Sequence, residues 1–293
     1  MEITKKFLRE ALEGQGYISE DEIVITLFLA LKLGKPLLIE GAPGVGKTEI
    51  AKVLANIFDT QLIRLQCYEG LDENKALYEW NYQRQLLKIQ MSQNLNQQGQ
   101  LEHDIFSYDY LLQRPLLKAI LSEKPPVLLI DEIDKTDDEF EAFLFEILSD
   151  FQVSIPELGT LKAKQIPIVV LTSNGERELS EGLKRRCIYL YISYPSVEKE
   201  VRILMAKVPE ASESLTHQIA KAIALIRINL EVRKKPSIAE TLDWAKALVA
   251  LHADALTPEL INDTLNLIFK NKSDKDIFNQ QIGPQALIKQ VNK

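Results

Sequence analysis

The sequence predicts an α/β protein with a five-stranded parallel sheet, followed by a C-terminal lid made only of helices. Three observations carry this prediction. Short apolar runs alternate with stretches of helical period as far as Pro195, a pattern typical of parallel strands joined by crossover helices. One run, VLLI at residues 127–130, is wholly apolar, as expected for a strand covered on both faces. Beyond Pro195 only helical periods recur, which places a domain boundary there.

The α/β part is expected to span residues 1–195 and the lid 196–293. Its strands are predicted at 36–39, 62–65, 127–130, 166–171 and 188–192. The spacing of apolar residues predicts helices at 20–33 and 47–58. A third helix is expected to begin with a capping box made by Thr136 and Glu139.

Two interruptions of the α/β pattern are expected. An insert at about 72–118 contains YEWNY and a Gln/Asn-rich run at 89–100; a loop of this length in a compact domain is usually functional or disordered. The segment at about 151–163 has two short runs around a Glu-Leu-Gly turn, which predicts a β-hairpin. At the other end, the polar stretch 271–293 is expected to be poorly ordered at its tip.

Composition limits the function. The chain has 293 residues, of which 46% are apolar and 26% charged, as in ordinary globular proteins. The formal net charge of −7 makes nucleic acid an unexpected partner. Cys67 and Cys187 form no disulfide framework or spaced metal site, and we interpret them as small packing residues of a cytoplasmic protein. Neither a signal peptide nor a membrane span is expected.

The first motif that carries chemistry is GAPGVGKT, between a predicted strand and a predicted helix. It matches G-x-x-x-x-G-K-[ST] in full. Its glycines let backbone N–H groups surround phosphate oxygens, and the amino end of the helix favours an anion. Lys47 is expected to contact the β- and γ-phosphates of ATP, and Thr48 to bind Mg²⁺. The residues expected to hold the nucleotide are Gly41, Ala42, Pro43, Gly44, Val45, Gly46, Lys47, Thr48 and Glu49.

Polar residues follow the third and fourth predicted strands, at the edge where ligands bind in open α/β sheets. Asp131 is expected to bind Mg²⁺, directly or through water, and Glu132 to polarise the attacking water. The alternative for this pair is a solvated acidic loop, but the complete glycine-rich motif favours catalysis. Asn174 would hydrogen-bond the γ-phosphate or the water, or else belong to an ordinary Ser-Asn-Gly turn. Arg185 and Arg186 are either solvated or present a guanidinium to a neighbouring subunit's nucleotide.

The order of GAPGVGKT, LLIDEID, TSN and LKRRC resembles the AAA+ superfamily of ATPases. The predicted hairpin before TSN and the insert after the second strand resemble the helix-2-insert clade and its MoxR-like ATPases. The segments RLQCYEGLDENKALYEWNYQRQLL, RPLL and KKPSIAETLDWAKAL resemble the CoxD-like subgroup. That subgroup is associated with maturation of carbon monoxide dehydrogenase and related enzymes. The resemblance covers roughly residues 15 to 250.

The resemblance implies roles for individual residues. Lys47 and Thr48 would be Walker A, Asp131 and Glu132 Walker B, and Asn174 sensor 1. Arg186, directly before Cys187, falls where related proteins carry an arginine finger, and Arg185 is the reserve candidate. The sensor 2 arginine of related proteins has no counterpart in KKPSIAET, where Lys235 is a weak substitute. Tyr17 and Ile18 would lie near the adenine.

The resemblance also implies partners: a homo-hexameric ring that binds ATP and Mg²⁺, a von Willebrand factor A (VWA) domain protein, and a client such as a molybdenum hydroxylase that the ring remodels or matures. Three alternatives are kept. A nucleic-acid motor of the same superfamily is disfavoured by the charge of −7. A binding switch with negligible turnover would not need Glu132. A P-loop kinase of small molecules would leave the two adjacent arginines unexplained.

Overall fold

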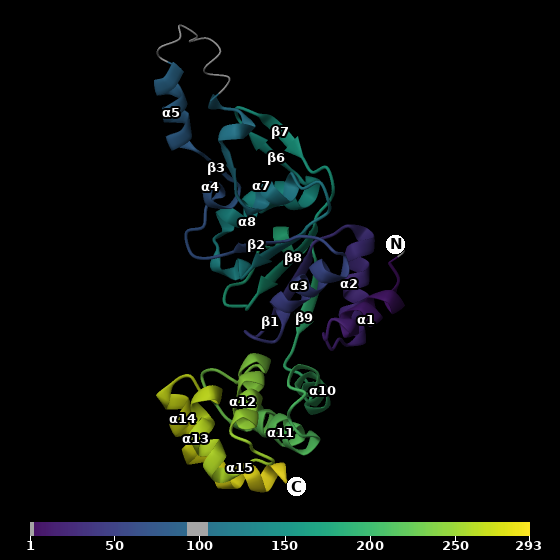
Figure 1. The fold of residues 1–293 in the computed structure, drawn as a ribbon, viewed down its shortest axis with the longest axis vertical. Coiled ribbons are helices and arrows are strands. Elements are labelled where there is room, and N and C mark those ends of the chain that lie inside the picture. Colours follow the sequence, from purple (N-terminus) through teal and green to yellow (C-terminus); the bar gives the residue numbers. More distant parts are fainter. Residues whose placement is uncertain (1–2, 93–104) are drawn as a thin grey trace. The chain divides into compact units, whose positions relative to one another are not determined.

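The computed structural model describes residues 3–92 and 105–293, and its α/β part is built on a five-stranded parallel sheet (Figure 1). The strands lie in the order β2-β5-β8-β1-β9. Their bounds are β1 Leu37–Gly41, β2 Leu62–Gln66, β5 Val127–Asp131, β8 Ile168–Ser173 and β9 Ile188–Ile192. All five predicted strands are present, so the predicted fold class is confirmed.

The register of the sheet determines which side chains meet at its carboxyl edge. Strand β5 is buried along its whole length, between β2 and β8. It pairs in parallel with β2, so that Gln66 lies beside Asp131, and with β8, so that Ile130 lies beside Leu171. Because parallel strands end at the same edge, the polar residues that follow these apolar runs are brought together there.

Helices cover the sheet and bury its apolar faces. Their bounds in the α/β part are α1 Lys5–Gly14, α2 Asp21–Leu33, α3 Lys47–Ile57, α7 Pro115–Ile120, α8 Asp138–Asp150 and α9 Glu181–Lys184. One continuous core joins Leu117 of α7 and Leu144 of α8 to Ile63, Leu128 and Val169 of the strands. Burial of such side chains contributes about 1.5–3 kcal/mol each.

The predicted cap of α8 is wrong by one residue. Asp137, not Thr136, is the N-cap, and its carboxylate accepts the N–H of Phe140 at 2.8 Å. Thr136 instead donates its hydroxyl to the carbonyl of Ile133 at 2.8 Å, which closes the short 3₁₀ turn Ile133–Lys135. The hydroxyl that would have capped the helix is therefore already satisfied.

The predicted hairpin is confirmed as β6 Gln152–Ile155 paired antiparallel with β7 Gly159–Lys162.

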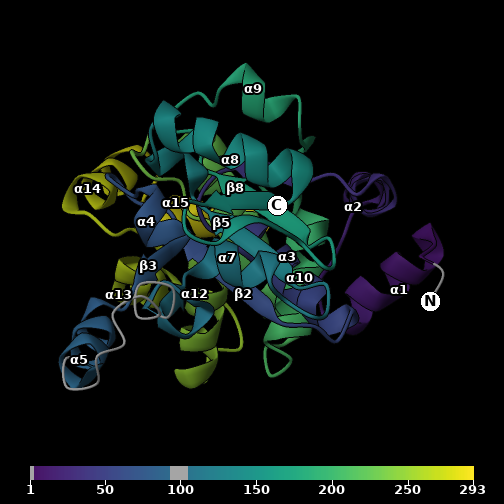
Figure 2. The ribbon, with the colours of Figure 1, turned by 90° about the horizontal axis from the view of Figure 1, so that it is seen from above.

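The insert has more regular structure than its composition suggests. It contains α4 Glu73–Ala76, β3 Tyr78–Trp80, α5 Tyr82–Ser92, a 3₁₀ turn Tyr108–Tyr110 and β4 Leu111–Gln113. Trp80 is buried, with its ring centroid 5.4 Å from that of Phe106, whereas Tyr82 is exposed. Figures 1 and 2 show α5 projecting away from the sheet. The Gln/Asn-rich run, from residue 93 on, lies outside the described residues.

After β9 the described chain is helical, as predicted. The helices are α10 Val197–Lys207, α11 Glu213–Asn229, α12 Ile238–Ala250, α13 Pro258–Ile268, α14 Lys272–Gln281 and α15 Gly283–Val291. The expectation that the tip of 271–293 is poorly ordered is wrong, because Phe278, Leu287 and Val291 are buried in the core of these helices. Phe278 on α14 and Leu287 and Val291, four residues apart on α15, anchor an otherwise polar segment.

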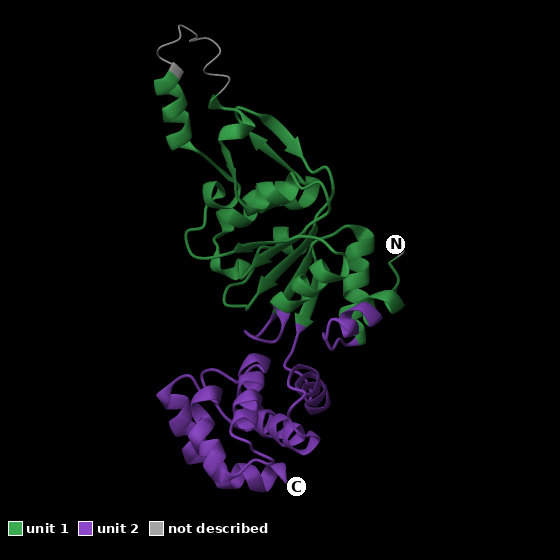
Figure 3. Ribbon diagram, in the orientation of Figure 1, with its two compact units in different colours: residues 1–9, 21–40, 48–191 green, residues 10–20, 41–47, 192–293 purple. Residues whose placement is uncertain are grey.

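Contacts between Cα atoms divide the chain into two compact units (Figure 3). One consists of residues 1–9, 21–40 and 48–191, and the other of 10–20, 41–47 and 192–293. The glycine-rich segment and the residues before α2 thus group with the helices of the lid. The expected division into 1–195 and 196–293 stays a prediction. None of the helices in the described ranges is long and apolar enough to span a membrane.

Candidate functional site

The glycine-rich segment forms a loop closed by its own lysine. Lys47, the first residue of α3, is buried, and its ammonium donates to the carbonyls of Gly41 at 2.6 Å and Ala42 at 2.9 Å. A buried ammonium is costly unless its donors are satisfied. The loop therefore surrounds the ammonium of Lys47 at the amino end of α3. This arrangement is suited to binding phosphate.

Two glycines in this loop are required by their surroundings. Gly44 has a φ of +74°, and a Cβ there would lie 2.2 Å from Ser237 Oγ at the start of α12. A Cβ on Gly41 would lie 2.3 Å from the carbonyl oxygen of Ile192. Both distances are shorter than any tolerable contact. Sequence reasoning missed this contact of Ser237. The one signal for it was that Ser237 lies in KKPSIAET, the segment compared with the sensor 2 region of related proteins.

The other residues expected to bind the nucleotide lie in or near the loop. Tyr17 Cε2 lies 3.9 Å from the position of a Cβ on Gly46, and Ile18 follows it, half-buried. Val45 is buried, whereas Pro43 is exposed. Glu49 lies in the first turn of α3, 3.6 Å from Lys52 on the helix surface.

The carboxyl edge of the sheet brings two hydroxyls to Asp131, the predicted Walker B aspartate. Thr48 Oγ1 donates to Asp131 Oδ1 at 3.1 Å, and Thr172 Oγ1 donates to the same oxygen at 2.6 Å. Hydroxyl and carboxylate oxygens are the ligands that Mg²⁺ prefers, together with the phosphates of a substrate. The described residues contain no cluster of three or more His, Cys, Asp or Glu that could hold a metal. The pair Thr48 and Asp131 suits Mg²⁺, for which the phosphate oxygens of a nucleotide would be further ligands.

Glu132 is held in an unusual backbone conformation. Its φ and ψ are 59° and 50°, the left-handed region that few residues other than glycine adopt. Its N–H donates to Thr172 Oγ1 at 2.9 Å, which fixes this turn to the neighbouring strand. Non-glycine residues in this region cost about 1–3 kcal/mol and are common at functional sites.

Two residues of β2 reach this acidic pair and were missed by sequence reasoning. Arg64 donates to Asp131 Oδ2 through Nε at 3.0 Å and Nη2 at 2.5 Å, and it also contacts Gln66. Gln66 Nε2 donates to Glu132 Oε2 at 3.2 Å. The signal was the alternation of β2, which leaves Arg64 and Gln66 exposed on one face.

Asp134 organises the turn that carries Asn174. Its Oδ2 accepts the N–H groups of Asn174 and Glu176, both at 3.1 Å, and its buried Oδ1 has no hydrogen-bond partner among the described residues.

Burial and the nearby carboxylates, first that of Asp131, raise the pKa of the Cys67 thiol to about 12. Burial likewise raises the pKa of Cys187 to about 12. Both thiols stay protonated near neutral pH, in agreement with a packing role.

The two candidate finger arginines differ in their contacts. Arg186 Nε donates to Ser149 Oγ at 2.7 Å and its Nη1 to the carbonyl of Gly182 at 2.8 Å, and its guanidinium lies over the Phe145 ring. Arg185 is exposed; its backbone N–H donates to the carbonyl of Glu181 at 3.2 Å, but no hydrogen bond, ion pair or ring contact joins its side chain to another described residue. The structure thus leaves Arg185, the reserve candidate, available to another molecule.

The region where sensor 2 was sought offers no arginine to the loop. Lys235 is exposed, whereas Ser237 is buried and forms a capping box with Glu240 at the start of α12. Arg227 binds the carbonyl of Pro236 at 2.7 Å and pairs with the buried Glu200, which fixes the segment before α12. The side chain nearest the position of a Cβ on Gly44 is the hydroxyl of Ser237.

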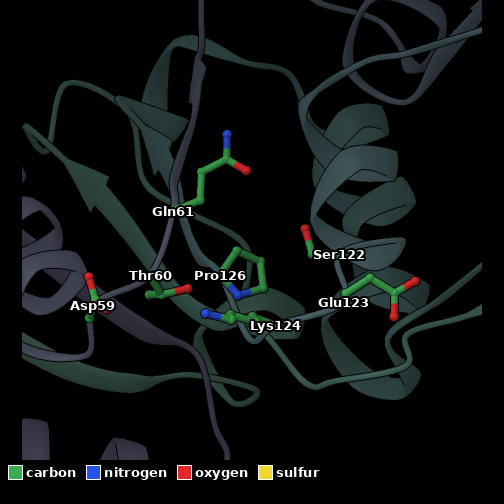
Figure 4. A pocket seen from close by; sticks show the side chains of 7 residues that line it. All are labelled: Asp59, Thr60, Gln61, Ser122, Glu123, Lys124 and Pro126. Atoms are coloured by element: carbon green, nitrogen blue, oxygen red, sulfur yellow. The ribbon is translucent and has the colours of Figure 1, made fainter.

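A polar cavity of about 440 Å³ lies at the opposite end of β2 and β5 (Figure 4). Its lining includes Thr60, Glu123 and Lys124, close to where these strands begin. Thr60 donates to the carbonyl of Pro125 at 2.7 Å. The residues expected to bind the nucleotide follow the carboxyl ends of the strands, so this cavity is not part of the candidate site.

Comparison with known proteins finds a family, several relatives and a solved structure to which this chain is similar. A family model described as an AAA domain (dynein-related subfamily) matches residues 36–187. YojN of Bacillus subtilis is 27% identical over 208 residues, which cover 68% of this chain and 62% of YojN. SH1500 of Staphylococcus haemolyticus is 27% identical over 252 residues, covering 82% of this chain and 86% of that protein. The chain thus spans less than two thirds of YojN but most of SH1500.

Among solved structures, the RuvB Holliday junction branch migration motor of Thermotoga maritima is similar, with a TM-score of 0.51 and 19% identity over 89% of this chain and 73% of that one. At this identity the likeness concerns the fold alone. The family model covers more than half of the 293 residues and includes the glycine-rich loop, Asp131 and Glu132, and both candidate finger arginines. The chain therefore belongs to the dynein-related subfamily of the AAA domain, within the AAA+ ATPases.

Proposed function

We propose that this protein binds and hydrolyses ATP in the presence of Mg²⁺. The observation that carries this proposal is the pair of consecutive residues Lys47 and Thr48. The ammonium of Lys47 lies inside the glycine-rich loop, and the hydroxyl of Thr48 lies 3.1 Å from Asp131 Oδ1. One peptide bond therefore joins the loop suited to phosphate and the oxygen pair suited to Mg²⁺.

Each residue has a task in this proposal. Lys47 and the N–H groups of the loop bind the β- and γ-phosphates, while Thr48 and Asp131 hold Mg²⁺, which offsets phosphate charge. Glu132 takes a proton from the attacking water, and Asn174 orients that water or the γ-phosphate. Arg185 of one copy contacts the nucleotide of the next in a ring. Tyr17, beside Gly46, covers the adenine side of the loop.

Replacing Lys47 with alanine is expected to abolish ATP binding, because it removes the only side-chain charge of the loop while leaving the backbone intact. Calorimetric titration with ATP and Mg²⁺ measures the effect. Lys52→Ala is the control, since Lys52 lies on the same helix but is exposed and next to Glu49. Unchanged affinity in the Lys47 variant contradicts the assignment of the loop.

The finer proposal is that hydrolysis remodels or matures a client protein, as in MoxR-like and CoxD-like ATPases. The motif order supports it, and the projecting helix α5 offers a surface for a partner such as a VWA-domain protein. The runner-up is a nucleic-acid motor, and the RuvB motor shows that such a function exists on this fold.

DNA separates these two proposals. We expect the ATPase rate to be unchanged by duplex or single-stranded DNA, because a chain of net charge −7 repels a polyanion. The rate is measured in a coupled assay at low ionic strength, which favours any binding to phosphates. A matched polyanion such as heparin controls for charge effects. Stimulation by DNA and not by heparin supports the motor and contradicts client remodelling.

A further inference from the structure

Arg64 is a cation placed directly on the Walker B aspartate. Strand β2 pairs Arg64 with Leu129 and Gln66 with Asp131, so the side chain of Arg64 reaches two residues along β5 to the aspartate. Both guanidinium contacts are to Asp131 Oδ2, from Nε at 3.0 Å and from Nη2 at 2.5 Å. Charge-assisted contacts of this kind are about twice as strong as neutral hydrogen bonds.

The carboxylate of Asp131 is fully engaged in this arrangement. Oδ1 accepts from Thr48 and Thr172, and Oδ2 accepts from Arg64. The side chain of Asp131 is only 4% exposed, whereas that of Arg64 is 52% exposed. A buried carboxylate needs a compensating charge, and the guanidinium that supplies it here is half-exposed to water.

We propose that Arg64 is the counter-ion of Asp131 when no metal is bound, and that it sets the Mg²⁺ concentration that the site requires. This inference rests on the proposed function. Arg64 and Mg²⁺ are attracted to the same carboxylate and repel each other, so each weakens the binding of the other. The guanidinium balances the charge of Asp131 when no metal is bound and raises the Mg²⁺ concentration needed for the metal to bind.

Replacing Arg64 with glutamine is therefore expected to increase the apparent Mg²⁺ affinity. The measurement is binding of a non-hydrolysable ATP analogue by the full chain at a fixed analogue concentration while Mg²⁺ is varied. The half-saturating Mg²⁺ concentration should fall roughly three- to tenfold, the size expected of one charge a few ångströms away in a partly solvated site. Arg64→Lys keeps the charge and should restore most of the parent value.

Thermal unfolding provides a second readout that needs no nucleotide. Without metal, Arg64→Gln leaves the buried carboxylate of Asp131 without its counter-ion, so its Tm in EDTA should be lower than that of the parent. Millimolar Mg²⁺ alone should raise the Tm of this variant more than that of the parent, because a ligand stabilises the state to which it binds more tightly.

Arg114→Gln is the matched control. Arg114 is 45% exposed and pairs with Glu79 at 2.5 Å in the insert, away from the sheet edge. Its loss should leave the Mg²⁺ midpoint unchanged. An Arg64→Gln midpoint equal to or higher than that of the parent overturns the counter-ion role. If the parent itself binds the analogue with no dependence on Mg²⁺, the proposed function fails along with the inference.

Discussion

An equal mixture of Lys47→Ala and Arg185→Ala chains is expected to recover ATPase activity that neither variant has alone. The side chain of Arg185 is exposed and makes no hydrogen bond, ion pair or ring contact with another described residue, so its guanidinium is available to a neighbouring subunit. Arginine fingers contribute roughly 10³- to 10⁵-fold to the rate in other P-loop enzymes, because a fixed positive charge stabilises the transition state. Arg185→Ala should bind ATP almost normally and hydrolyse it very slowly. In a ring assembled from both variants, some interfaces join a subunit with an intact Lys47 to a neighbour with an intact Arg185, and these interfaces should hydrolyse ATP.

Arg186→Ala provides the comparison. Arg186 was the first candidate for the finger, but its guanidinium is held by Ser149, Gly182 and the Phe145 ring. Its loss should lower the Tm, and the folded fraction should retain most of its turnover. Recovery on mixing Lys47→Ala with Arg186→Ala, and not with Arg185→Ala, would reverse the assignment. No recovery with either, despite demonstrated subunit exchange, would contradict a finger acting between subunits.

Glu132→Gln is expected to keep ATP bound and to stop its hydrolysis. An amide has the shape of the carboxylate but cannot accept the proton of the attacking water, and positioned general bases contribute roughly 10²- to 10⁴-fold. Thr48 and Asp131, which would hold Mg²⁺, are untouched, so affinity should change little. Single-turnover rates measure the loss and calorimetry measures the binding; a fall in kcat with unchanged binding marks a group that acts in the transition state.

Glu176→Gln is the matched control for this variant. Glu176 follows β8 at the same edge of the sheet, is exposed, and pairs with Lys135. Its backbone N–H, which donates to Asp134, survives the substitution. Turnover in this control should stay near that of the parent. Hydrolysis by Glu132→Gln at the parent rate would place the base elsewhere.

The parts of the fold predicted best are those that local pattern decides. The run VLLI requires burial on both faces, and it forms the central strand β5 between β2 and β8. The hairpin at 152–162 follows from its turn residues. The two errors have local causes: the hydroxyl of Thr136 is used by a preceding turn, and Phe278 anchors a tail whose mean polarity suggested disorder.

The sequence by itself determined the chemistry that neighbouring residues perform together. Lys47 and Thr48 follow each other in the chain, and so do Asp131 and Glu132. Within each pair, adjacency in the sequence fixes the relative positions of the two residues. Tertiary structure decided the contacts between residues far apart in sequence. It placed Arg64 on Asp131 and Ser237 against Gly44, and it fixed Arg186 while leaving Arg185 exposed. Such contacts depend on strand register and helix packing, which arise from the whole core rather than from any short segment.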